Sequence, residues 1–189
     1  MNFDRTAFQK IHTRQIDLAT YKCTSETFVV EGVLKDRRLA DAYGPTGKLF
    51  PPGTIHHMII RMQVKGPDLI IEDIEVEMPT LPNEFCIETI NCLEPIKGMR
   101  IVSGFTSKVK KLVGGVKGCV HLVALLTAMA PAAFQGIFSG MDRKYKTPEM
   151  VSKSMENTCW VWRSGGPLMN RLGDGENRNS EKLGSSNAR

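Results

Sequence analysis

In the first half of the chain, hydrophobic and polar positions alternate with the period of two that is typical of β-strands. Residues 26–36 are rich in β-branched side chains, residues 55–64 are mostly aliphatic, and residues 69–79 alternate most clearly. In the last segment, apolar side chains share one face and acidic side chains the other: Ile70, Ile74, Val76 and Met78 against Asp73, Glu75 and Glu77. The Gly- and Pro-rich residues 42–54 predict a loop, and the turn at 65–68 predicts a hairpin. We therefore expect a three-stranded antiparallel sheet with one solvated face.

Beyond residue 80, the hydrophobic period lengthens to that of α-helices. Asn83 is a good N-cap for a first helix, and Pro95 is expected to end it. A short helical segment is predicted at 106–113. A long apolar helix is predicted over about 117–137, with Pro131 as a point of bending. Strands followed by helices are typical of the α+β class, so we predict a small antiparallel sheet packed on helices.

The composition predicts one compact domain with a C-terminal extension. The chain has 189 residues, of which 41% are hydrophobic, and this is enough to build a core. We assign residues 1–140 to a compact α+β domain. Residues 141–172 still carry Trp160 and Trp162, so this extension is expected to dock on the domain. Residues 173–189 have almost nothing to bury and are expected to form a disordered tail.

Net charge, the N-terminal sequence and the number of cysteines limit the partners and the cellular compartment that we expect. The formal net charge is +5, but the densest basic run, at 107–112, has no interleaved aromatic residues, so we expect no nucleic-acid partner. The N-terminus lacks the apolar segment of a signal peptide. The apolar run Val120–Phe134 is shorter than a membrane span, so we expect no membrane partner. Five cysteines without an export signal predict reduced thiols in a cytoplasmic protein.

Four side chains of the metal-ligand type lie near the ends of three predicted elements. His56 begins the second strand, and Cys86 lies in the first turn of the first helix. Cys119 and His121 begin the long helix. Two sulfurs and two imidazoles suit a closed tetrahedral zinc site, and one ligand fewer would leave the open position of a catalytic zinc or iron site. We predict all four as ligands of Zn or Fe. The alternative is core packing, since free cysteine is often buried and His56 shares the apolar strand face with Met58.

A second set of charged side chains is assigned a catalytic role. Glu31 and Asp36 lie in and after the first predicted strand, and Arg61 lies in the second. A carboxylate near a histidine can act as a general base or orient a metal ligand, and we expect Arg61 to contact the substrate. Taken alone, a residue of each of these types is more often a surface charge. Cys23 and Cys92 are assigned to the core.

Four stretches of the chain resemble a bacterial family that is described only as a domain of unknown function. They read VVEGVLKD, PPGTIHHMIIRMQV, IIEDIEVEMPTLPNEFC and GCVHLVALLTAMAPAAFQ, and they span roughly residues 10–140. The resemblance is most specific at Pro52–Met58 and Gly118–Leu122. It marks the candidate residues above: Glu31, Asp36, His56, Arg61, Cys86, Cys119 and His121. His57 stands where that family usually has an aspartate. The resemblance implies no particular activity.

The order of elements is also similar to that of iron–sulfur assembly scaffold proteins (NifU/IscU-like). In that family, cysteines and a His-Cys pair gather at one end of a small sheet, and His56, Cys86 and the Cys119/His121 pair would take these places. Met58 stands where that family has an aspartate. The resemblance implies a fold of the scaffold type and, as one alternative function, an iron–sulfur or metal scaffold.

The expected function is metal-assisted hydrolysis or a lyase reaction on a small carboxylate or ester, aromatic ones included. The sequence is compatible with a homo-oligomer. A rival hypothesis is a non-catalytic binding module, with methionines and the pair Trp160 and Trp162 around a hydrophobic ligand or partner. A third is a metal-free enzyme with Cys119 as nucleophile. In a helix Cys119 and His121 would point about 200° apart, so His56 would have to be its base.

Overall fold

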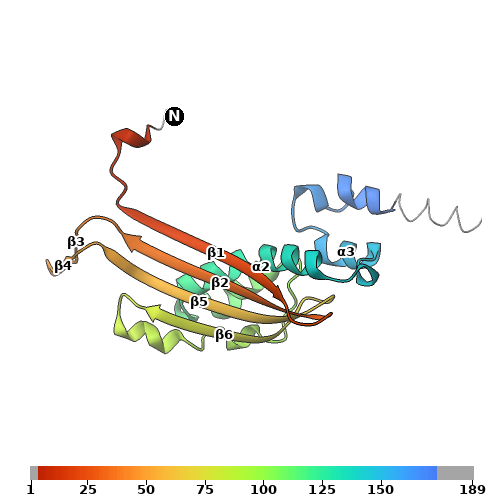
Figure 1. Cartoon of the computed structure of the whole chain (residues 1–189), viewed down its shortest axis with the longest axis horizontal. Helices are drawn as coiled ribbons and strands as arrows, with labels where there is room; N and C mark the ends of the chain where they lie inside the picture. Colours follow the sequence, from red (N-terminus) through yellow and green to blue (C-terminus); the bar gives the residue numbers. More distant parts are fainter. Residues whose placement is uncertain (1–3, 174–189) are drawn as a thin grey trace, which may run out of the picture.

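The computed structural model describes residues 4–173 and shows a twisted sheet with the long helix packed behind one face (Figure 1). The four main strands are antiparallel and follow the order β1-β2-β5-β6. A separate two-stranded hairpin, β3 with β4, projects from the connection between β2 and β5. The strand bounds are β1 His12–Lys22, β2 Thr27–Arg38, β3 Ala42–Tyr43, β4 Leu49–Phe50, β5 Gly53–Lys65 and β6 Ile70–Thr80.

The α+β class is confirmed, but the expected number of three strands is wrong because β1 adds a fourth at the sheet edge. The alternation in β1 is short: half-buried Ile16, Leu18 and Thr20 face the helices and alternate with exposed residues. His12 and Arg14, which precede them on the same face, are polar, so the apolar signal of this strand is weak. Pairing with β2 along its whole length compensates for that weak signal.

Strand β6 follows the predicted alternation from Ile74 onward, but not at its first residues. Ile74 is buried and Val76 and Met78 are half-buried on the core face, as expected. The register between β5 and β6 shifts near Gln63, so Ile71 rather than Ile70 is the buried residue at the start of the strand. An irregularity of this kind changes which side chains face the core, and a strict period of two cannot anticipate it.

Three α-helices and several short 3-10 segments follow or flank the sheet. The α-helices are α1 Phe105–Val113, α2 Val120–Gly140 and α3 Pro148–Met155. The helix expected from Asn83 to Pro95 is instead two 3-10 segments. Asn83 does cap the first of them, since its side chain accepts from the Phe85 N–H. No residue of that segment is fully buried, so it lacks the apolar packing that stabilises a longer helix. The 3-10 bounds are η1 Arg5–Ala7, η2 Glu84–Thr89, η3 Glu94–Ile96, η4 Gly115–Lys117, η5 Arg143–Tyr145 and η6 Trp160–Trp162.

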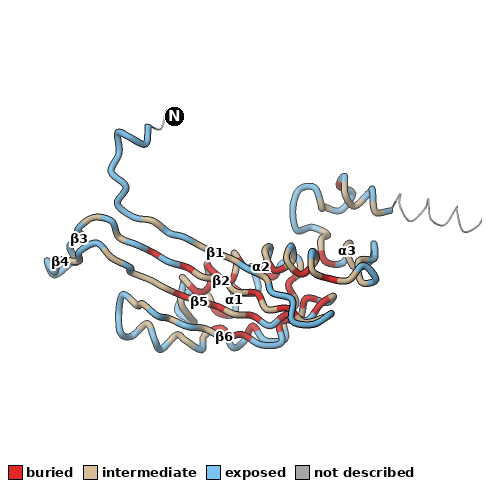
Figure 2. The backbone as a smooth tube through the Cα atoms, viewed as in Figure 1, coloured by how far each residue is buried: buried red, intermediate tan, exposed pale blue. Residues whose placement is uncertain are grey.

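The core lies between the sheet and helix α2 (Figure 2). The sheet contributes the inward residues of its two central strands, and α2 contributes a row of leucines and alanines with Met129. Backbones approach closely at two glycines. A Cβ on Gly136 of α2 would lie 2.2 Å from the Thr20 hydroxyl oxygen of β1, and one on Gly32 would lie 2.6 Å from the Met129 sulfur. These contacts hold α2 lengthwise under the sheet.

Helix α2 spans 21 residues and lies about three residues further along the chain than the helix predicted over about 117–137. It is long and apolar enough to cross a bilayer by length and composition alone, a property that core helices of water-soluble proteins share. In this structure it packs against β1, β2 and α1. Pro131 lies inside the helix, where it removes one backbone hydrogen bond.

The segment after α2 lies against the domain through a few specific contacts. Met141 is buried, Lys22 lies 3.0 Å from the Asp142 carboxylate, and the Ser103 hydroxyl donates to the Asn157 carbonyl. Docking of residues 141–172 as a separate extension stays a prediction. The tail predicted as disordered falls, from residue 174 on, outside the described residues.

Candidate metal centre

The register of the sheet sets three polar residues side by side at one end of its core face. Arg14 of β1 pairs with Asp36 of β2, and Asp36 pairs with His56 of β5. All three lie on the side that carries the buried Leu34 and Met58, because residues two apart in a strand share a face. The row lies where β1 begins, β2 ends and β5 begins. Polar groups thereby gather at the end of an apolar face.

Asp36 is the centre of this group. Its side chain is only 2% exposed, and Arg14 binds it in a bidentate manner, with Nε 2.7 Å from Oδ1 and Nη2 2.7 Å from Oδ2. His56 Nδ1 lies 3.0 Å from Oδ2. The Arg14 guanidinium, by its hydrogen bonds and charge, lowers the pKa of Asp36 against the opposing effect of burial. Asp36 is therefore a carboxylate at neutral pH, held in one orientation.

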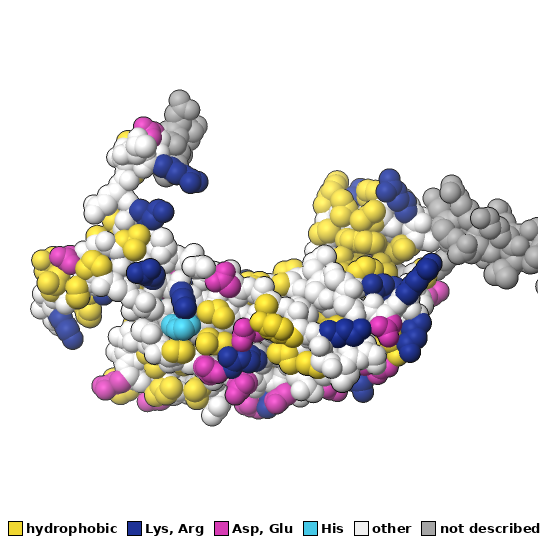
Figure 3. Space-filling model, viewed as in Figure 1, with side chains coloured by type: hydrophobic (Ala, Val, Ile, Leu, Met, Phe, Trp, Pro, Cys, Tyr) yellow, Lys and Arg dark blue, Asp and Glu magenta, His cyan; other side chains and the backbone are white. Residues whose placement is uncertain are grey.

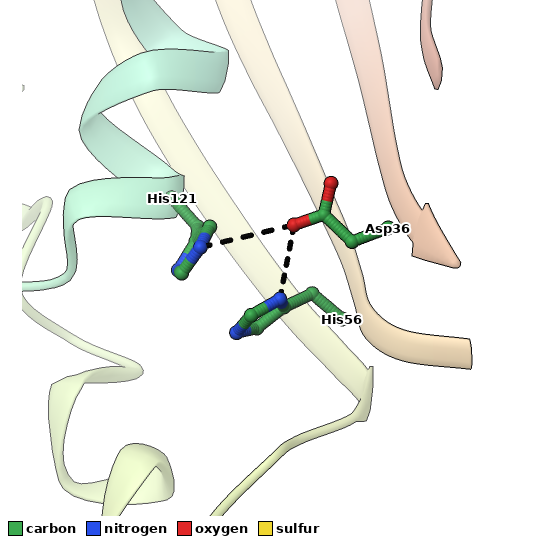
Figure 4. A group of neighbouring side chains, drawn as sticks. All are labelled: Asp36, His56 and His121. Carbon is green, nitrogen blue, oxygen red and sulfur yellow. Dashed lines mark hydrogen bonds and ion pairs between the residues drawn. The ribbon is translucent and has the colours of Figure 1, made fainter. Parts of the chain in front are cut away.

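His121 completes the group from the first turn of α2 (Figure 4). Its Nε2 lies 3.8 Å from Asp36 Oδ2, and its ring lies against that of His56 with the centroids 3.7 Å apart. Burial lowers the pKa of both histidines, and the neighbouring His56 lowers that of His121 further. Both are neutral imidazoles near pH 7, which is the form that binds metals.

Cys119 lies beside His121, contrary to the expectation that the two point apart. Its Sγ is 3.8 Å from His121 Nδ1. The expectation assumed helical geometry at both positions. Cys119 is instead the N-cap of α2, with the extended angles φ −95° and ψ 125°, so the 100° rotation per residue does not apply to it. The nitrogen of His121 that faces Cys119 is the one turned away from Asp36.

None of the cysteines among residues 4–173 belongs to this group, and predicted ligand Cys119 contacts it only through His121. The ligand atoms that lie within 4.8 Å of one another there belong to Asp36, His56 and His121, and Cys86 is not among them. Cys86 lies half-buried in η2, where its N–H donates to the Asn83 carbonyl. Cys23, assigned to the core, is exposed. Cys92 is half-buried, and burial raises the pKa of its thiol.

The predicted catalytic set of Glu31, Asp36 and Arg61 is divided between the two faces of the sheet. Asp36 belongs to the group described above, whereas Glu31 and Arg61 pair on the outer face, where Arg61 Nε donates to Glu31 at 2.8 Å. Arg61 also binds Glu77, and these hydrogen bonds raise its pKa. Acidic and basic side chains of this kind lie among apolar ones on the face shown in Figure 3. The three residues do not meet because Glu31 and Asp36 are an odd number of positions apart in one strand, and their side chains therefore point to opposite faces.

Two residues of the site were not predicted as such. No role is predicted from the sequence for Arg14 or His12, although His12 Nε2 lies 3.8 Å from Asp36 Oδ1. The signal that could have revealed them is the continued alternation of positions 12, 14, 16, 18 and 20 on one strand face. That signal required β1 to be recognised as a strand.

The donor set fits a divalent transition metal. One carboxylate oxygen and two imidazole nitrogens are the ligands of many catalytic zinc and non-haem iron sites. Ligand atoms around one zinc ion lie about 3.4 Å apart at tetrahedral angles. Here Asp36 Oδ2 is 3.0 Å from His56 Nδ1 and 3.8 Å from His121 Nε2, so small side-chain shifts would bring all three to one ion. Three protein ligands leave coordination positions open for water or substrate.

Comparison with protein-family models matches residues 12–135 to a family described as "Protein of unknown function (DUF2889)". The matched segment includes Arg14, Asp36, His56, Cys119 and His121. No curated protein and no solved structure matches the chain. The resemblance to a family of unknown function is thereby confirmed, whereas the similarity to iron–sulfur scaffold proteins gains no support.

Proposed function

The chain belongs to this family of unknown function, and from the geometry of the site we propose that Asp36, His56 and His121 bind one Zn²⁺ or Fe²⁺ ion in an enzyme. One observation carries the proposal. The three ligand atoms lie within 4.8 Å of one another around a buried carboxylate. A bound ion of this kind supplies Lewis-acid activation of water or of a carbonyl oxygen. Hydrolysis or a lyase reaction is the class of chemistry that follows.

The charges of the site favour an anionic substrate. The charge of Arg14 cancels that of Asp36, and both imidazoles are neutral. A divalent cation would therefore leave the site with a net positive charge, which a substrate carboxylate can neutralise. Arg14 and His12 keep 40% and 47% of their side chains exposed beside the carboxylate. They are positioned to contact such a group, which supports a small carboxylate or ester as substrate.

Metal analysis of the full chain without a histidine tag tests the proposal. We expect one equivalent of Zn or Fe after purification or anaerobic reconstitution. We expect His56→Ala, His121→Ala and Asp36→Asn each to lower metal affinity by about a hundredfold or more. His57→Ala is the matched control, because this histidine lies on the same strand but on the opposite sheet face. A parent that binds no metal, or a control that loses as much affinity as His56→Ala, would contradict the proposal.

A metal-free cysteine hydrolase is the second candidate, favoured by the Cys119 contact. His121 lies between the other two groups: its Nδ1 is 3.8 Å from Cys119 Sγ, and its Nε2 is 3.8 Å from Asp36 Oδ2. His121 could take the thiol proton at Nδ1 while Asp36 stabilises the charged ring from the side of Nε2. In this mechanism the base is His121 and not His56.

The two candidates predict different variant phenotypes. p-Nitrophenyl esters serve as probes. The cysteine mechanism predicts that turnover by the parent continues in the presence of a chelator. It also predicts that Cys119→Ser abolishes the burst of product and leaves the metal content unchanged. The metal mechanism predicts that chelation and His56→Ala abolish turnover whereas Cys119→Ser retains it. Iodoacetamide labelling of Cys119 that is much slower in His121→Ala supports the cysteine mechanism.

A further inference from the structure

A cavity of about 500 Å³ lies between helices α1 and α2 and the segment that follows α3. Its walls come from residues 101–107, from α2 between Thr127 and Gln135, from residues 154 and 155 at the end of α3, and from residues 157–159. The metal-centre residues do not line it. Its volume lies within the range of small-molecule binding sites, roughly 300–1,000 Å³.

The lining of the cavity is apolar with scattered neutral polar groups. Among residues 4–173, no Asp, Glu, Lys, Arg or His side chain lines it. The apolar walls are formed by Ile101, Val102, Phe105, Ala130, Pro131, Phe134 and Met155. Hydroxyl groups of serines and threonines lie between them. An ionised ligand would lose its hydration here without gaining a charged partner, so the site favours an uncharged molecule.

Pro131 gives the cavity one hydrogen-bond acceptor of its own. Proline has no N–H, so the carbonyl of Thr127, four residues earlier in α2, lacks its usual helical donor. Thr127 and Pro131 both line the cavity. A donor on a ligand can take the place of the missing N–H, because the carbonyl oxygen of half-buried Thr127 keeps its capacity to accept a hydrogen bond. The Gln135 amide lies one helical turn further along the same wall.

We infer that this cavity binds an uncharged, mostly apolar small molecule that donates a hydrogen bond to the Thr127 carbonyl. The site is separate from the metal centre and does not depend on it. It also relocates the hydrophobic ligand site expected around Trp160 and Trp162, since neither tryptophan lines the cavity. Trp160 is 75% exposed, with the Arg163 guanidinium over its ring.

Two matched fluorescent probes test the charge and size of the ligand. N-phenyl-1-naphthylamine is uncharged and has one N–H, and 1-anilinonaphthalene-8-sulfonate is the same scaffold with a sulfonate. We expect saturable one-to-one binding of the neutral probe to the full chain, at least about tenfold tighter than the sulfonated one. Equal or tighter binding of the sulfonate, or no saturable binding of the neutral probe, overturns the inference.

Matched variants on α1 test the location. Thr106 lines the cavity and Leu112 does not, and both are exposed on the same helix. Thr106→Trp should fill the opening and weaken the neutral probe at least about tenfold, whereas Leu112→Trp should change its affinity less than about twofold. Far-UV CD confirms that both variants fold. Equal effects of the two substitutions overturn the assignment of the site.

Pro131→Ala tests the hydrogen bond. Alanine restores the N–H that can donate to the Thr127 carbonyl, and it favours the helix, so the variant should fold. In the parent, N-phenyl-1-naphthylamine should bind more tightly than its N-methyl derivative, which has no N–H. In Pro131→Ala this preference should disappear. A preference that is unchanged in the variant, or absent in the parent, overturns the role of the carbonyl.

Discussion

Asp36 connects the sheet to helix α2 through a single buried carboxylate. Two of its cross-strand neighbours, Arg14 and His56, and the helix residue His121 all direct nitrogen atoms at its two oxygens. A buried charge is tolerated only when such partners compensate for the lost hydration. The same partners that compensate for the burial of Asp36 place it at the centre of the proposed metal site.

Replacing the charge at Asp36 should destabilise the protein as well as abolish metal binding. We expect Asp36→Asn to lower the free energy of unfolding by about 1–3 kcal/mol, because the amide leaves Arg14 without a charged partner. Urea unfolding in the presence of a chelator measures this. Asp73→Asn is the control, since Asp73 pairs with Lys97 on the exposed side of β6 and its loss should change stability little. A cost as large at Asp73 would contradict the prediction.

The two arginines of the sheet provide a second comparison at this scale. Arg14 and Arg61 both bind carboxylates, but on opposite faces. Arg14→Gln should weaken metal binding about tenfold or more by freeing Asp36 to rotate. Arg61→Gln should leave metal affinity within about twofold. Calorimetric titration with Zn²⁺ measures both affinities. An equal loss of affinity in the two variants would contradict the prediction that only the arginine on the core face supports metal binding.

The position of α2 decides whether His121 reaches Asp36. The helix lies against β1 at Gly136, where the Thr20 side chain occupies the space of a Cβ. The contact at Gly32 is of a different kind, because the nearest atoms belong to the flexible Met129 side chain. The contact at Gly136 is therefore the more rigid of the two.

Gly136→Ala should be destabilising although alanine is the better helix former. The new methyl group would overlap Thr20 and push α2 away from β1, at a cost of about 1–3 kcal/mol that exceeds the gain of about 1 kcal/mol in helix propensity. Thermal unfolding measures the loss, and metal titration should show weaker binding because His121 moves with the helix. Gly136→Ala together with Thr20→Gly should recover part of both. Ser139→Ala, on the exposed face of α2, is the control.

At the scale of the whole molecule, the two proposed sites use different parts of the chain. The proposed metal centre lies within the family segment 12–135, whereas the cavity also needs residues 154, 155 and 157–159 beyond it. The family segment thus contains every residue assigned to metal chemistry. The wall of the cavity belongs in part to the extension that follows the long helix.

A chain that ends at Lys146 should separate the two sites. It keeps Met141 and Tyr145, which pack against the core, and removes one wall of the cavity. We expect cooperative thermal unfolding and metal affinity within about twofold of the parent, with binding of the neutral probe lost. Calorimetry and fluorescence titration measure the two properties. Loss of cooperative unfolding would show that residues 147–173 belong to the domain itself.

The periodic segments could be predicted from the sequence, and the short or interrupted ones could not. The strands β2, β5 and β6 and the helix α2 carry long apolar patterns. Strand β1 has only a short apolar stretch, and the expected helix after Asn83 breaks into 3-10 turns. Local patterns identify an element only when it buries enough apolar surface to repeat its period several times.

The sequence by itself determined the class of the fold, the core face of β5 and the choice of His56 and His121 as candidate ligands, because these depend on residue type and local period. Only the tertiary structure decided which side chains meet. Cross-strand register brought Arg14 to Asp36, the opposite sheet face separated Glu31 and Arg61 from them, and the cap of α2 turned Cys119 toward His121. Register and docking depend on contacts between residues far apart in the chain, and no local pattern contains that information.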